Sequence, residues 1–396
     1  MMQKDEKIKI LFVDDEKNVL QGLRRMLRPK RNEWDMQFVA SGPDALEVMK
    51  SDEIDIVISD MRMPGMDGAE LLARVRDLRP ETVRIILSGY AEQESVLKTI
   101  GPAHQFLGKP CDPDLLIETV EKTLSLRQFL TSRGLTQLIC SLETIPSLPT
   151  HYSQMIEALE NPNTSGNELS AIIAKDVAMT TEILKLANSS YFSRPNQILN
   201  VQEAVSMIGF DTIRALIFKV GIFRQYQGDK RLVEMLESIN RSSLSIAELA
   251  KDIAKKYDLS PPEKTRLLTA SILCNLGLII LLDQRPDDFS IFRDKLAKGT
   301  SLAEAELESF GATHGEISAY LLGLWGFNYK ILEMIAFHVE PDKFTGVETK
   351  MLSCLHIAWA MSKQCCVDGE PNKKLNKAFL RKTSLFADIV DAKGVL

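Results

Sequence analysis

The chain has 396 residues, of which 45% are hydrophobic and 26% are charged, and its formal net charge is −6. This composition is ordinary for a globular protein, and the length predicts two or three domains at roughly 150 residues each. The negative charge argues against a general nucleic-acid binder, because such a protein neutralises phosphates with an excess of basic side chains.

Three patterns predict a cytoplasmic protein with no membrane contact. Residues Met1 to Lys7 are polar and charged and do not resemble a signal peptide. The longest apolar run, Leu267 to Leu282, is interrupted by an amide and a glycine and is short for a membrane span. The six cysteines are scattered without a Cys-x-x-Cys pair, which predicts reduced thiols rather than disulfides or a zinc ribbon.

The first part of the chain alternates short β-branched runs with helical patterns. Alternating strands and helices joined by short loops require a parallel sheet with helices on both faces, so we expect a doubly wound, flavodoxin-like α/β fold. The expected strands cover residues 8–13, 35–39, 56–60, 83–87 and 105–107, and the expected helices cover residues 18–27, 45–49, 67–78, 92–100 and 112–129.

Carboxylates stand at the ends of two of these strands. Asp14 and Asp15 follow the first strand, and Asp60 ends the third. The carboxyl edge of such a sheet is where ligands bind, so these acids should meet there. Like charges in close proximity are unfavourable, and Mg²⁺ relieves them because it prefers oxygen ligands. The pattern therefore predicts a magnesium site.

Two more polar side chains follow strands at the same predicted edge. Ser88 comes after the fourth strand and Lys109 after the fifth. A hydroxyl and an ammonium beside a metal site can bind a phosphoryl group, which the three acids alone would repel.

Residues ~7–125 resemble the receiver domain of a bacterial two-component response regulator. The matching pieces, in order and spacing, are Asp14-Asp15, Ser59-Asp60 with Met-Arg-Met-Pro-Gly-Met-Asp-Gly after it, Ser88-Gly89 and Lys109-Pro110. The resemblance implies that Asp60 accepts a phosphoryl group from a sensor histidine kinase. It also implies that Asp14, Asp15, Asp60 and the backbone carbonyl of Arg62 hold Mg²⁺.

The same resemblance implies a switch. Lys109 would ion-pair with one phosphate oxygen, and Ser88 would hydrogen-bond another. The inward movement of Ser88 would let Phe106 rotate into the core and alter the surface near the fourth helix and fifth strand. The alternative, that Phe106 is a static core aromatic, stays open.

From Thr131 onward the strand-like runs end and helical periodicity takes over. After an extended piece at Ile145–Pro149 we expect an all-α body, large enough for a core of its own. Its expected helices cover residues 168–175, 179–187, 201–208, 212–223, 232–257, 263–282, 303–310, 315–324, 330–337 and 351–363.

Residues ~136–340 resemble the HDOD domain, a helical module related to the HD metal-dependent phosphohydrolases. The residues that carry the resemblance are Ile145–Pro149, Ile173–Asp176, Ile183–Ser189, Ile198, Ala204-Val205, Ile208–Phe210, Thr313–Glu316 and Leu324–Gly326. We therefore expect a receiver at 1–125, a helical linker at 126–140, an HDOD domain at 141–345 and a helical extension at 346–396.

The resemblance implies that the metal ligands of the HD relatives are replaced in this chain. A working HD site needs a His, a His-Asp pair and a distant Asp. In this chain Ser242, the pair Cys274-Asn275 and Trp359 fall at those places. A neutral amide, a hydroxyl and an indole make a poor metal site. We therefore expect no enzyme activity beyond the self-catalysed phosphorylation and dephosphorylation of Asp60.

Two histidines remain where the relatives often carry His, at His314 and His338. We interpret both as hydrogen-bonded structural residues, and the alternative is that they bind a metal. The partners expected are a sensor histidine kinase and a downstream signalling protein, and pairing with a second copy stays open. Two alternative functions remain: a phosphohydrolase with an unusual metal set, and a sensor whose degenerate HD site binds a nucleotide or small molecule.

Overall fold

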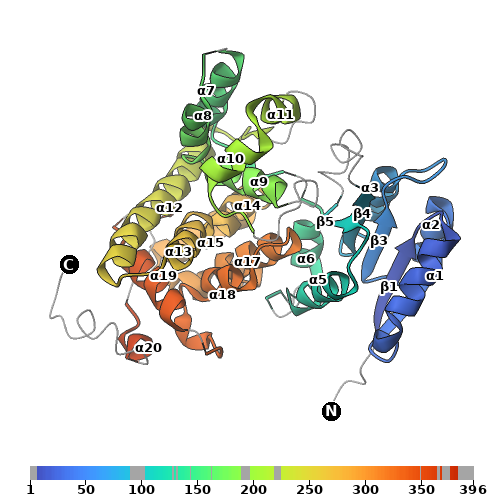
Figure 1. The fold of residues 1–396 in the computed structure, drawn as a ribbon. Coiled ribbons are helices and arrows are strands. Elements are labelled where there is room, and N and C mark those ends of the chain that lie inside the picture. The colour runs from blue at the N-terminus through green and yellow to red at the C-terminus, as the bar shows by residue number, and fades with distance from the viewer. Residues whose placement is uncertain are drawn as a thin grey trace.

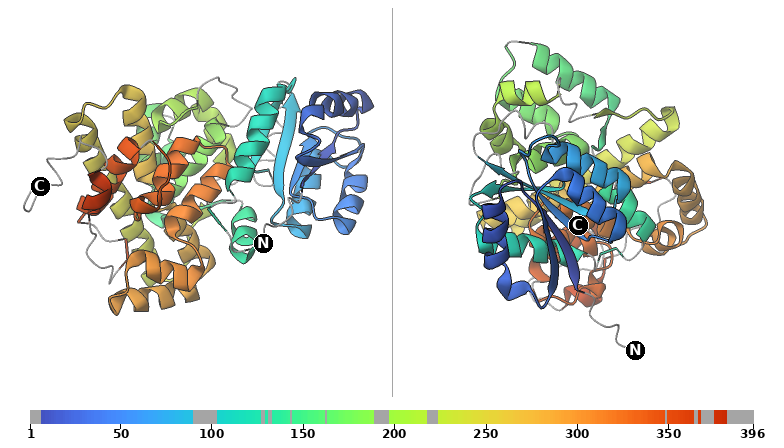
Figure 2. Two further views of the ribbon diagram at one scale, coloured as in Figure 1. Left: turned by 90° about the horizontal axis from the view of Figure 1, so that it is seen from below. Right: turned by 90° about the vertical axis from the view of Figure 1, so that its right-hand side faces the viewer.

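The chain folds into a sheet flanked by helices and a larger body of helices (Figure 1). The computed structural model describes residues 7–89, 103–126, 129–130, 133–142, 144–161, 163–188, 197–217, 224–347, 349–363, 366–367 and 375–381. The predicted helix at 92–100 lies outside these residues. Helices α5 and α6 lie between the sheet and the helical body (Figure 1; Figure 2, left).

The sheet has five parallel strands in the order β2-β1-β3-β4-β5. The strands are β1 (Ile8–Val13), β2 (Trp34–Val39), β3 (Ile56–Asp60), β4 (Val83–Gly89) and β5 (Gln105–Lys109). Their helices are α1 (Lys17–Met26), α2 (Gly42–Ser51), α3 (Gly68–Leu78) and α5 (Pro113–Ser125), with a short 3₁₀ helix η1 at Arg28–Lys30. The predicted doubly wound α/β fold is confirmed.

The two faces of the sheet belong to different apolar cores. The smaller core lies under α2 and α3 and includes Leu11 and Val57 of the strands. The larger core begins under α1 and α5, where it includes Phe12 and Leu116. It continues through Leu126 into the helical body without a break in apolar contact. The sheet and the helical body therefore share one hydrophobic core.

The connection to the helical body is not one long helix. Asp112 caps α5 and Pro113 opens it as predicted, but α5 ends at Ser125, and the expected continuation to Phe129 is wrong. The Phe129 N–H donates to the Leu126 carbonyl at 2.9 Å, which closes a turn. A separate helix, α6 (Arg133–Cys140), follows.

The remaining elements make the predicted all-α body. They are α7 (Pro149–Glu160), α8 (Gly166–Ile173), α9 (Val177–Ala187), α10 (Val201–Ile208), α11 (Phe210–Ala215), α12 (Lys230–Lys256), α13 (Pro261–Leu273), α14 (Leu276–Gln284), α15 (Pro286–Ala297), α16 (Leu302–Phe310), α17 (His314–Leu324), α18 (Tyr329–Phe337), the 3₁₀ helix η5 (Pro341–Lys343), α19 (Thr349–Met361) and α20 (Lys377–Leu380). Two short parallel strands, β6 (Pro146–Ser147) and β7 (Arg224–Gln225), tie its start to its middle.

Two of these helices, α7 and α15, are absent from the sequence interpretation for the same reason. Each begins with a proline at its first position, Pro149 in α7 and Pro286 in α15. Proline is favoured there because its missing N–H would have had no partner in the helix anyway. Pro149 therefore both ends the extended piece and starts a helix.

The predicted helix at 263–282 is broken in two. A turn at Cys274-Asn275 separates α13 from α14. The Ser318 hydroxyl from α17 contacts the Cys274 carbonyl at 3.2 Å and accepts the Gly277 N–H at 2.7 Å. A side chain from another helix thus takes over backbone groups that a continuous helix would pair within itself.

Residues Pro261–Gln284, which include both halves, form a helical stretch long and apolar enough to cross a membrane. In the described part of the chain it is the one such stretch, and 78% of its most apolar window is buried inside the fold. Burial of this kind is typical of core helices. The five cysteines described are all free.

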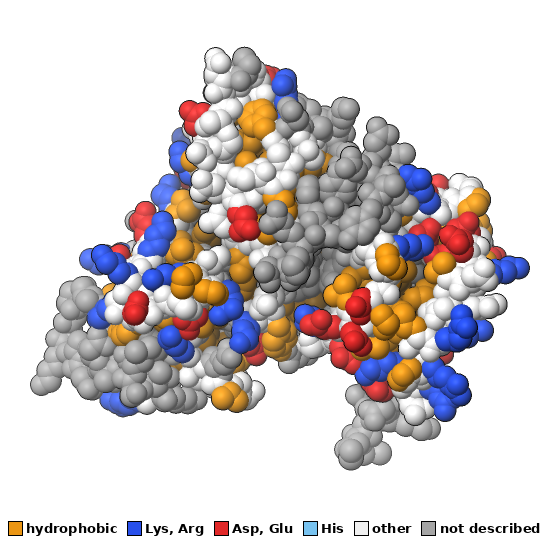
Figure 3. All heavy atoms as spheres, viewed as in Figure 1, with side chains coloured by type: hydrophobic (Ala, Val, Ile, Leu, Met, Phe, Trp, Pro, Cys, Tyr) orange, Lys and Arg blue, Asp and Glu red, His pale blue; other side chains and the backbone are white. Residues whose placement is uncertain are grey.

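Basic and acidic side chains are mixed over both parts of the molecule on the face drawn in Figure 3. Among the side chains coloured there, the two signs alternate rather than separating into a basic and an acidic surface.

We predict that Gly277→Ala destabilises the protein. A Cβ at Gly277 would lie 2.2 Å from the carbonyl oxygen of His314, so α14 and α17 would have to separate. Such overpacking costs about 1–3 kcal/mol. Thermal melting should show a lower midpoint, whereas Gly22→Ala in α1, where a Cβ meets nothing within 4 Å, should leave it unchanged or raise it. Equal midpoints for the two variants would contradict this prediction.

Candidate functional site

Three carboxylates meet at the carboxyl edge of the sheet. Asp14 and Asp15 directly follow β1, and Asp60 is the last residue of β3. Each can offer one oxygen so that all three oxygens lie within 4.8 Å of one another. Asp14 and Asp60 are buried, whereas Asp15 is exposed. Three convergent carboxylate oxygens are a donor set that suits a hard divalent cation, so the residues present fit Mg²⁺.

Lys109 brings positive charge to these acids from the end of β5. Its Nζ lies 2.8 Å from Oδ2 of Asp14 and also forms an ion pair with Oδ1 of Asp60. Burial disfavours the ammonium, but the hydrogen bonds with Asp14 and Asp60 outweigh it, and the pKa of Lys109 is raised. Lys109 is therefore a fixed cation that bridges two buried carboxylates.

Asp60 is held by its own loop as well as by Lys109. Burial raises the pKa of Asp60 above its ordinary value, and the hydrogen bond to Lys109 opposes this shift. Oδ2 of Asp60 accepts the backbone N–H of Arg62 at 3.2 Å, and Oδ1 of Asp14 accepts that of Glu16 at 2.9 Å. These contacts fix the direction in which each carboxylate points.

Gly68 is required at this site, and the sequence analysis missed it. A Cβ at Gly68 would lie 2.2 Å from the carbonyl oxygen of Asp60, so only glycine lets α3 start so close to the strand end. The Gly68 N–H also donates to the Met61 carbonyl at 2.9 Å. The sequence signal for it is the glycine that ends the motif following Asp60.

Ser88 and Phe106 occupy the two strands beside the acids. Ser88 is buried near the end of β4 and pairs in register with Gly108 of β5. Phe106, two residues before Gly108, is half-buried against the smaller core. Phe106 thus lies on the sheet face covered by α2 and α3, between the acidic site and the start of β5.

The residues predicted from the sequence to occupy a degenerate HD site are buried among helices α12 to α19, and we call them the helical polar cluster. Its members are Ser242, Cys274, Asn275, His314, His338 and Trp359. The Asn275 amide donates from Nδ2 to the Ser243 hydroxyl at 3.1 Å, and the Cys366 thiol donates to the Ser242 hydroxyl at 3.1 Å. Asn275 therefore has the buried partner that its apolar helix demands.

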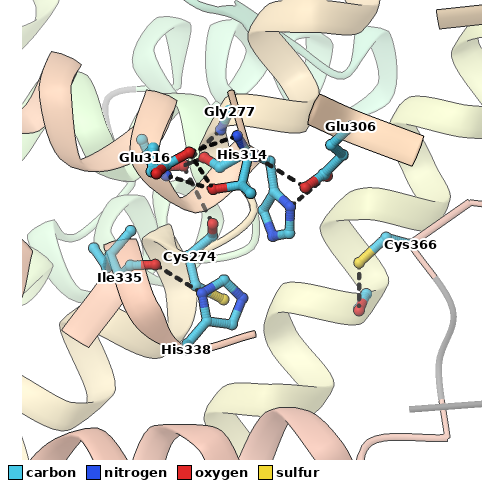
Figure 4. A network of polar contacts seen from close by, with 11 residues as sticks. Cys274, Gly277, Glu306, His314, Glu316, Ile335, His338 and Cys366 are labelled. Carbon is cyan, nitrogen blue, oxygen red and sulfur yellow. Dashed lines mark hydrogen bonds and ion pairs between the residues drawn. The ribbon is translucent and has the colours of Figure 1, made fainter. Parts of the chain in front are cut away.

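The two histidines are oriented by acceptors on their Nδ1 atoms. Nδ1 of His314 lies 2.6 Å from Oε1 of Glu306, and Nδ1 of His338 lies 2.7 Å from the Ile335 carbonyl (Figure 4). The two ring centroids are 5.1 Å apart, and the His338 ring is 5.9 Å from that of Trp359. Figure 4 shows Cys274 beside the two imidazoles.

Glu306 is a second residue that the sequence analysis missed. Its carboxylate is fully buried and also accepts the backbone N–H of His314 at 3.2 Å. Glu304, Glu306 and Glu308 alternate along α16, so spacing alone does not show which one faces inward.

Oδ1 of Asn275 and Nε2 of His314 have no hydrogen-bond partner among the described residues. Within those residues, Asp14, Asp15 and Asp60 are the single group of three or more ligand side chains close enough to hold a metal.

Comparison with known proteins agrees with both halves of this description. Residues 10–121 match the response regulator receiver domain, and residues 145–341 match the HDOD domain. The hydrogenase transcriptional regulatory protein HoxA of Bradyrhizobium diazoefficiens is 37% identical over 119 residues, which is 30% of this chain and 24% of HoxA. Sporulation initiation phosphotransferase F of Bacillus subtilis is 34% identical over 123 residues, which is 30% of this chain and 95% of that protein.

The MmoQ response regulator of Methylococcus capsulatus is a solved structure that covers 63% of this chain and 98% of its own, with 16% identity and a TM-score of 0.45. The chain spans about a quarter of the length of the HoxA proteins it matches.

The fold and its acidic edge define a receiver of the two-component class. More specifically, the chain belongs to the response regulators in which a receiver domain is followed by an HDOD domain, and the predicted resemblance to both families is confirmed.

We predict that Glu306→Ala destabilises the fold because it leaves Nδ1 and the backbone N–H of His314 buried without an acceptor. Each buried unpaired donor costs about 1–3 kcal/mol. Denaturant unfolding should show a loss of about 2–6 kcal/mol, the sum for the two donors. Glu308 lies on the same helix as Glu306 and forms a surface ion pair with Lys295 of α15. Glu308→Ala removes that ion pair and should change the free energy of unfolding by less than about 1 kcal/mol. Comparable losses in the two variants would contradict the inward role of Glu306.

Proposed function

We propose that this protein is a phosphorylation-controlled response regulator in which Asp60 takes a phosphoryl group from a sensor histidine kinase. The observation that carries the proposal is the bridge made by Lys109 between Asp14 and Asp60 at an edge where a third acid, Asp15, also converges. We propose domain limits of 1–125 for the receiver, 126–140 for the linker, 141–345 for the HDOD domain and 346–396 for the extension.

In the transfer step an Oδ atom of Asp60 attacks the phosphorus of a phosphohistidine. The new P–O bond forms as the P–N bond breaks, and the imidazole leaves with the electron pair of that bond. The reaction needs Asp60 as a carboxylate, and the Lys109 ammonium favours that form against the effect of burial. When bound, Mg²⁺ would be held by Asp14, Asp15, Asp60 and the Arg62 carbonyl, and would neutralise charge on the phosphoryl oxygens.

After transfer, the acyl phosphate offers its oxygens to groups already beside Asp60. Lys109 pairs with one oxygen, and the Ser88 hydroxyl donates a hydrogen bond to another. Both groups lie on the strands β4 and β5, so the new bonds pull on these two strands. Phe106, half-buried on β5, changes its packing in response, which is how a local charge change becomes a different surface.

The helical body acts by binding rather than by catalysis. The neutral side chains of Ser242 and Asn275 are engaged with Cys366 and Ser243, and Trp359 packs beside His338. These contacts support a structural role for the helical polar cluster. The downstream partner in this proposal is another signalling protein.

One observation favours a second candidate, a sensor site. Oδ1 of Asn275 and Nε2 of His314 are buried acceptors without a partner among the described residues. Bound hydrogen-bond donors would satisfy these acceptors, whereas metal-dependent hydrolysis would need anionic ligands that the helical polar cluster lacks.

We predict that Asp60→Asn abolishes labelling of the protein by acetyl phosphate in the presence of Mg²⁺. The amide is a far weaker nucleophile than the carboxylate, and it carries no charge to attract a cation. Phosphate-affinity electrophoresis measures the labelled fraction. Asp35→Asn, an exposed acid on β2, should label like the parent, and chelation of Mg²⁺ should suppress labelling in both labelled forms. Undiminished labelling of Asp60→Asn would remove the proposed phosphoacceptor.

We predict that the full-length protein does not hydrolyse phosphodiesters above background when Mg²⁺, Mn²⁺, Zn²⁺ or Fe²⁺ is added. Bis(p-nitrophenyl) phosphate is a suitable substrate, and metal content is measured on the purified protein. Turnover that is lost in His338→Ala, together with a stoichiometric transition metal, would replace the binding role by a hydrolase.

A further inference from the structure

The receiver and the helical body meet at the ends of β4 and β5 that lie opposite the acidic site. Arg84 is in β4, four residues before Ser88, and its guanidinium is fully buried. His104 immediately precedes β5, the strand that carries Phe106 and Lys109, and is also buried. The strands that touch the acidic site at one end therefore contact the helical body at the other.

Both side chains contact the carbonyl oxygen of Cys140, the last residue of α6. Nη2 of Arg84 donates to that oxygen at 2.6 Å, and Nε2 of His104 lies 3.0 Å from it. The backbone N–H of Arg84 donates to Nδ1 of His104 at 3.2 Å. Nε2 is therefore the protonated nitrogen of His104, and it donates to the Cys140 carbonyl. We call this set of contacts the Arg84–His104 latch.

The latch has the electrostatics of a helix C-cap. The carboxyl end of a helix carries partial negative charge, so a cation there is favourable. Burial lowers the pKa of Arg84 to about 10, which still leaves the guanidinium charged at neutral pH. Burial and the nearby Arg84 lower the pKa of His104 well below its usual value, so the imidazole is neutral and offers one proton.

A steric contact lies beside the latch. Leu126 sits against Gly323 of α17 so closely that a Cβ at Gly323 would be 2.3 Å from Cδ2 of Leu126. Nε2 of Gln105, on β5, donates to the Gly323 carbonyl at 3.3 Å. The Cys140 thiol lies 3.6 Å from the Tyr320 hydroxyl of α17. We call the Leu126–Gly323 contact the α17 notch.

We propose that the Arg84–His104 latch and the α17 notch are the junction through which phosphorylation of Asp60 loosens the helical body from the receiver. This proposal rests on the proposed function. Ser88 and Arg84 share one strand, and Gln105 and Lys109 share its neighbour, so a pull at the acidic edge moves groups that the latch holds in place. Packed junctions respond to such shifts by changing between discrete arrangements rather than by bending.

The chemistry of the junction suits repeated opening. The donors of Arg84, His104 and Gln105 can pair with water once exposed, whereas separating purely apolar surfaces offers no such compensation. Coupling between binding equilibria is reciprocal, so if beryllofluoride binding at Asp60 loosens the junction, a loosened junction must bind beryllofluoride more tightly. A variant that loosens the junction should therefore change ligand binding at the acidic site, which a purely structural contact would not do.

The test is hydrogen exchange by mass spectrometry on the full chain, with and without beryllofluoride and Mg²⁺. We expect beryllofluoride to speed exchange in α6 and in the last turn of α17. Gly323→Ala should speed exchange there without beryllofluoride, because the added methyl displaces Leu126. The same variant should bind beryllofluoride about fivefold more tightly or more than the parent in a titration with Mg²⁺ present. Alanine has the higher helix propensity, so faster exchange in α17 reports the wedge and not a weaker helix.

Gly22→Ala is the matched control, since its Cβ meets nothing within 4 Å and α1 is remote from α17. It should show the exchange and the beryllofluoride affinity of the parent. Unchanged or slower exchange in α6 and α17 on beryllofluoride binding, or the parent's beryllofluoride affinity in Gly323→Ala, would overturn the junction while leaving the phosphoacceptor intact. Absence of labelling at Asp60 in the parent would instead overturn the proposed function itself.

Discussion

The receiver depends on one ammonium group placed among carboxylates. Asp14 and Asp60 are buried side by side, and two like charges in such a place would each shift toward the neutral form. Lys109 contacts both, and its positive charge offsets the repulsion between them, so the strand ends stay together. Lys109 reaches them only because β5 lies at the edge of a parallel sheet whose other strands deliver the acids. The order of the strands therefore determines whether the negative charge of the site is balanced.

The helical body is joined to this sheet by two kinds of contact. Apolar side chains continue from the face under α5 into the body through Leu126, and they hold the two parts together. Polar groups of Arg84 and His104 meet the end of α6 beside them. The apolar contacts hold the helical body to the sheet but do not fix its orientation. The hydrogen bonds of Arg84 and His104 fix that orientation, because hydrogen bonds depend on angle and distance. Together, the two kinds of contact attach the helical body firmly to the sheet and define the place at which the two can separate.

Features carried by local pattern were predictable from the sequence, and features that depend on distant contacts were not. The acids at strand ends were found because parallel strands end at a common edge, and the all-α body was found from its periodicity. The break at Cys274-Asn275 was missed because its cause, Ser318, lies on another helix. Glu306 was missed because three glutamates alternate along α16 and only tertiary packing selects one. The over-long helix to Phe129 has the same origin, since helical propensity does not show where packing ends a helix.

The shared core also bears on how such chains are assembled from modules. A cut after Ser125 would look natural from the sheet alone, yet it would run through a continuous apolar surface and separate Arg84 from the carbonyl it caps. A receiver cut there would lose Leu126 and expose the apolar side chains of α5 that continue into the helical body. In recombination or engineering, the unit that can be exchanged is thus the sheet, its helices and α6 together, with the seam on the surface of α17.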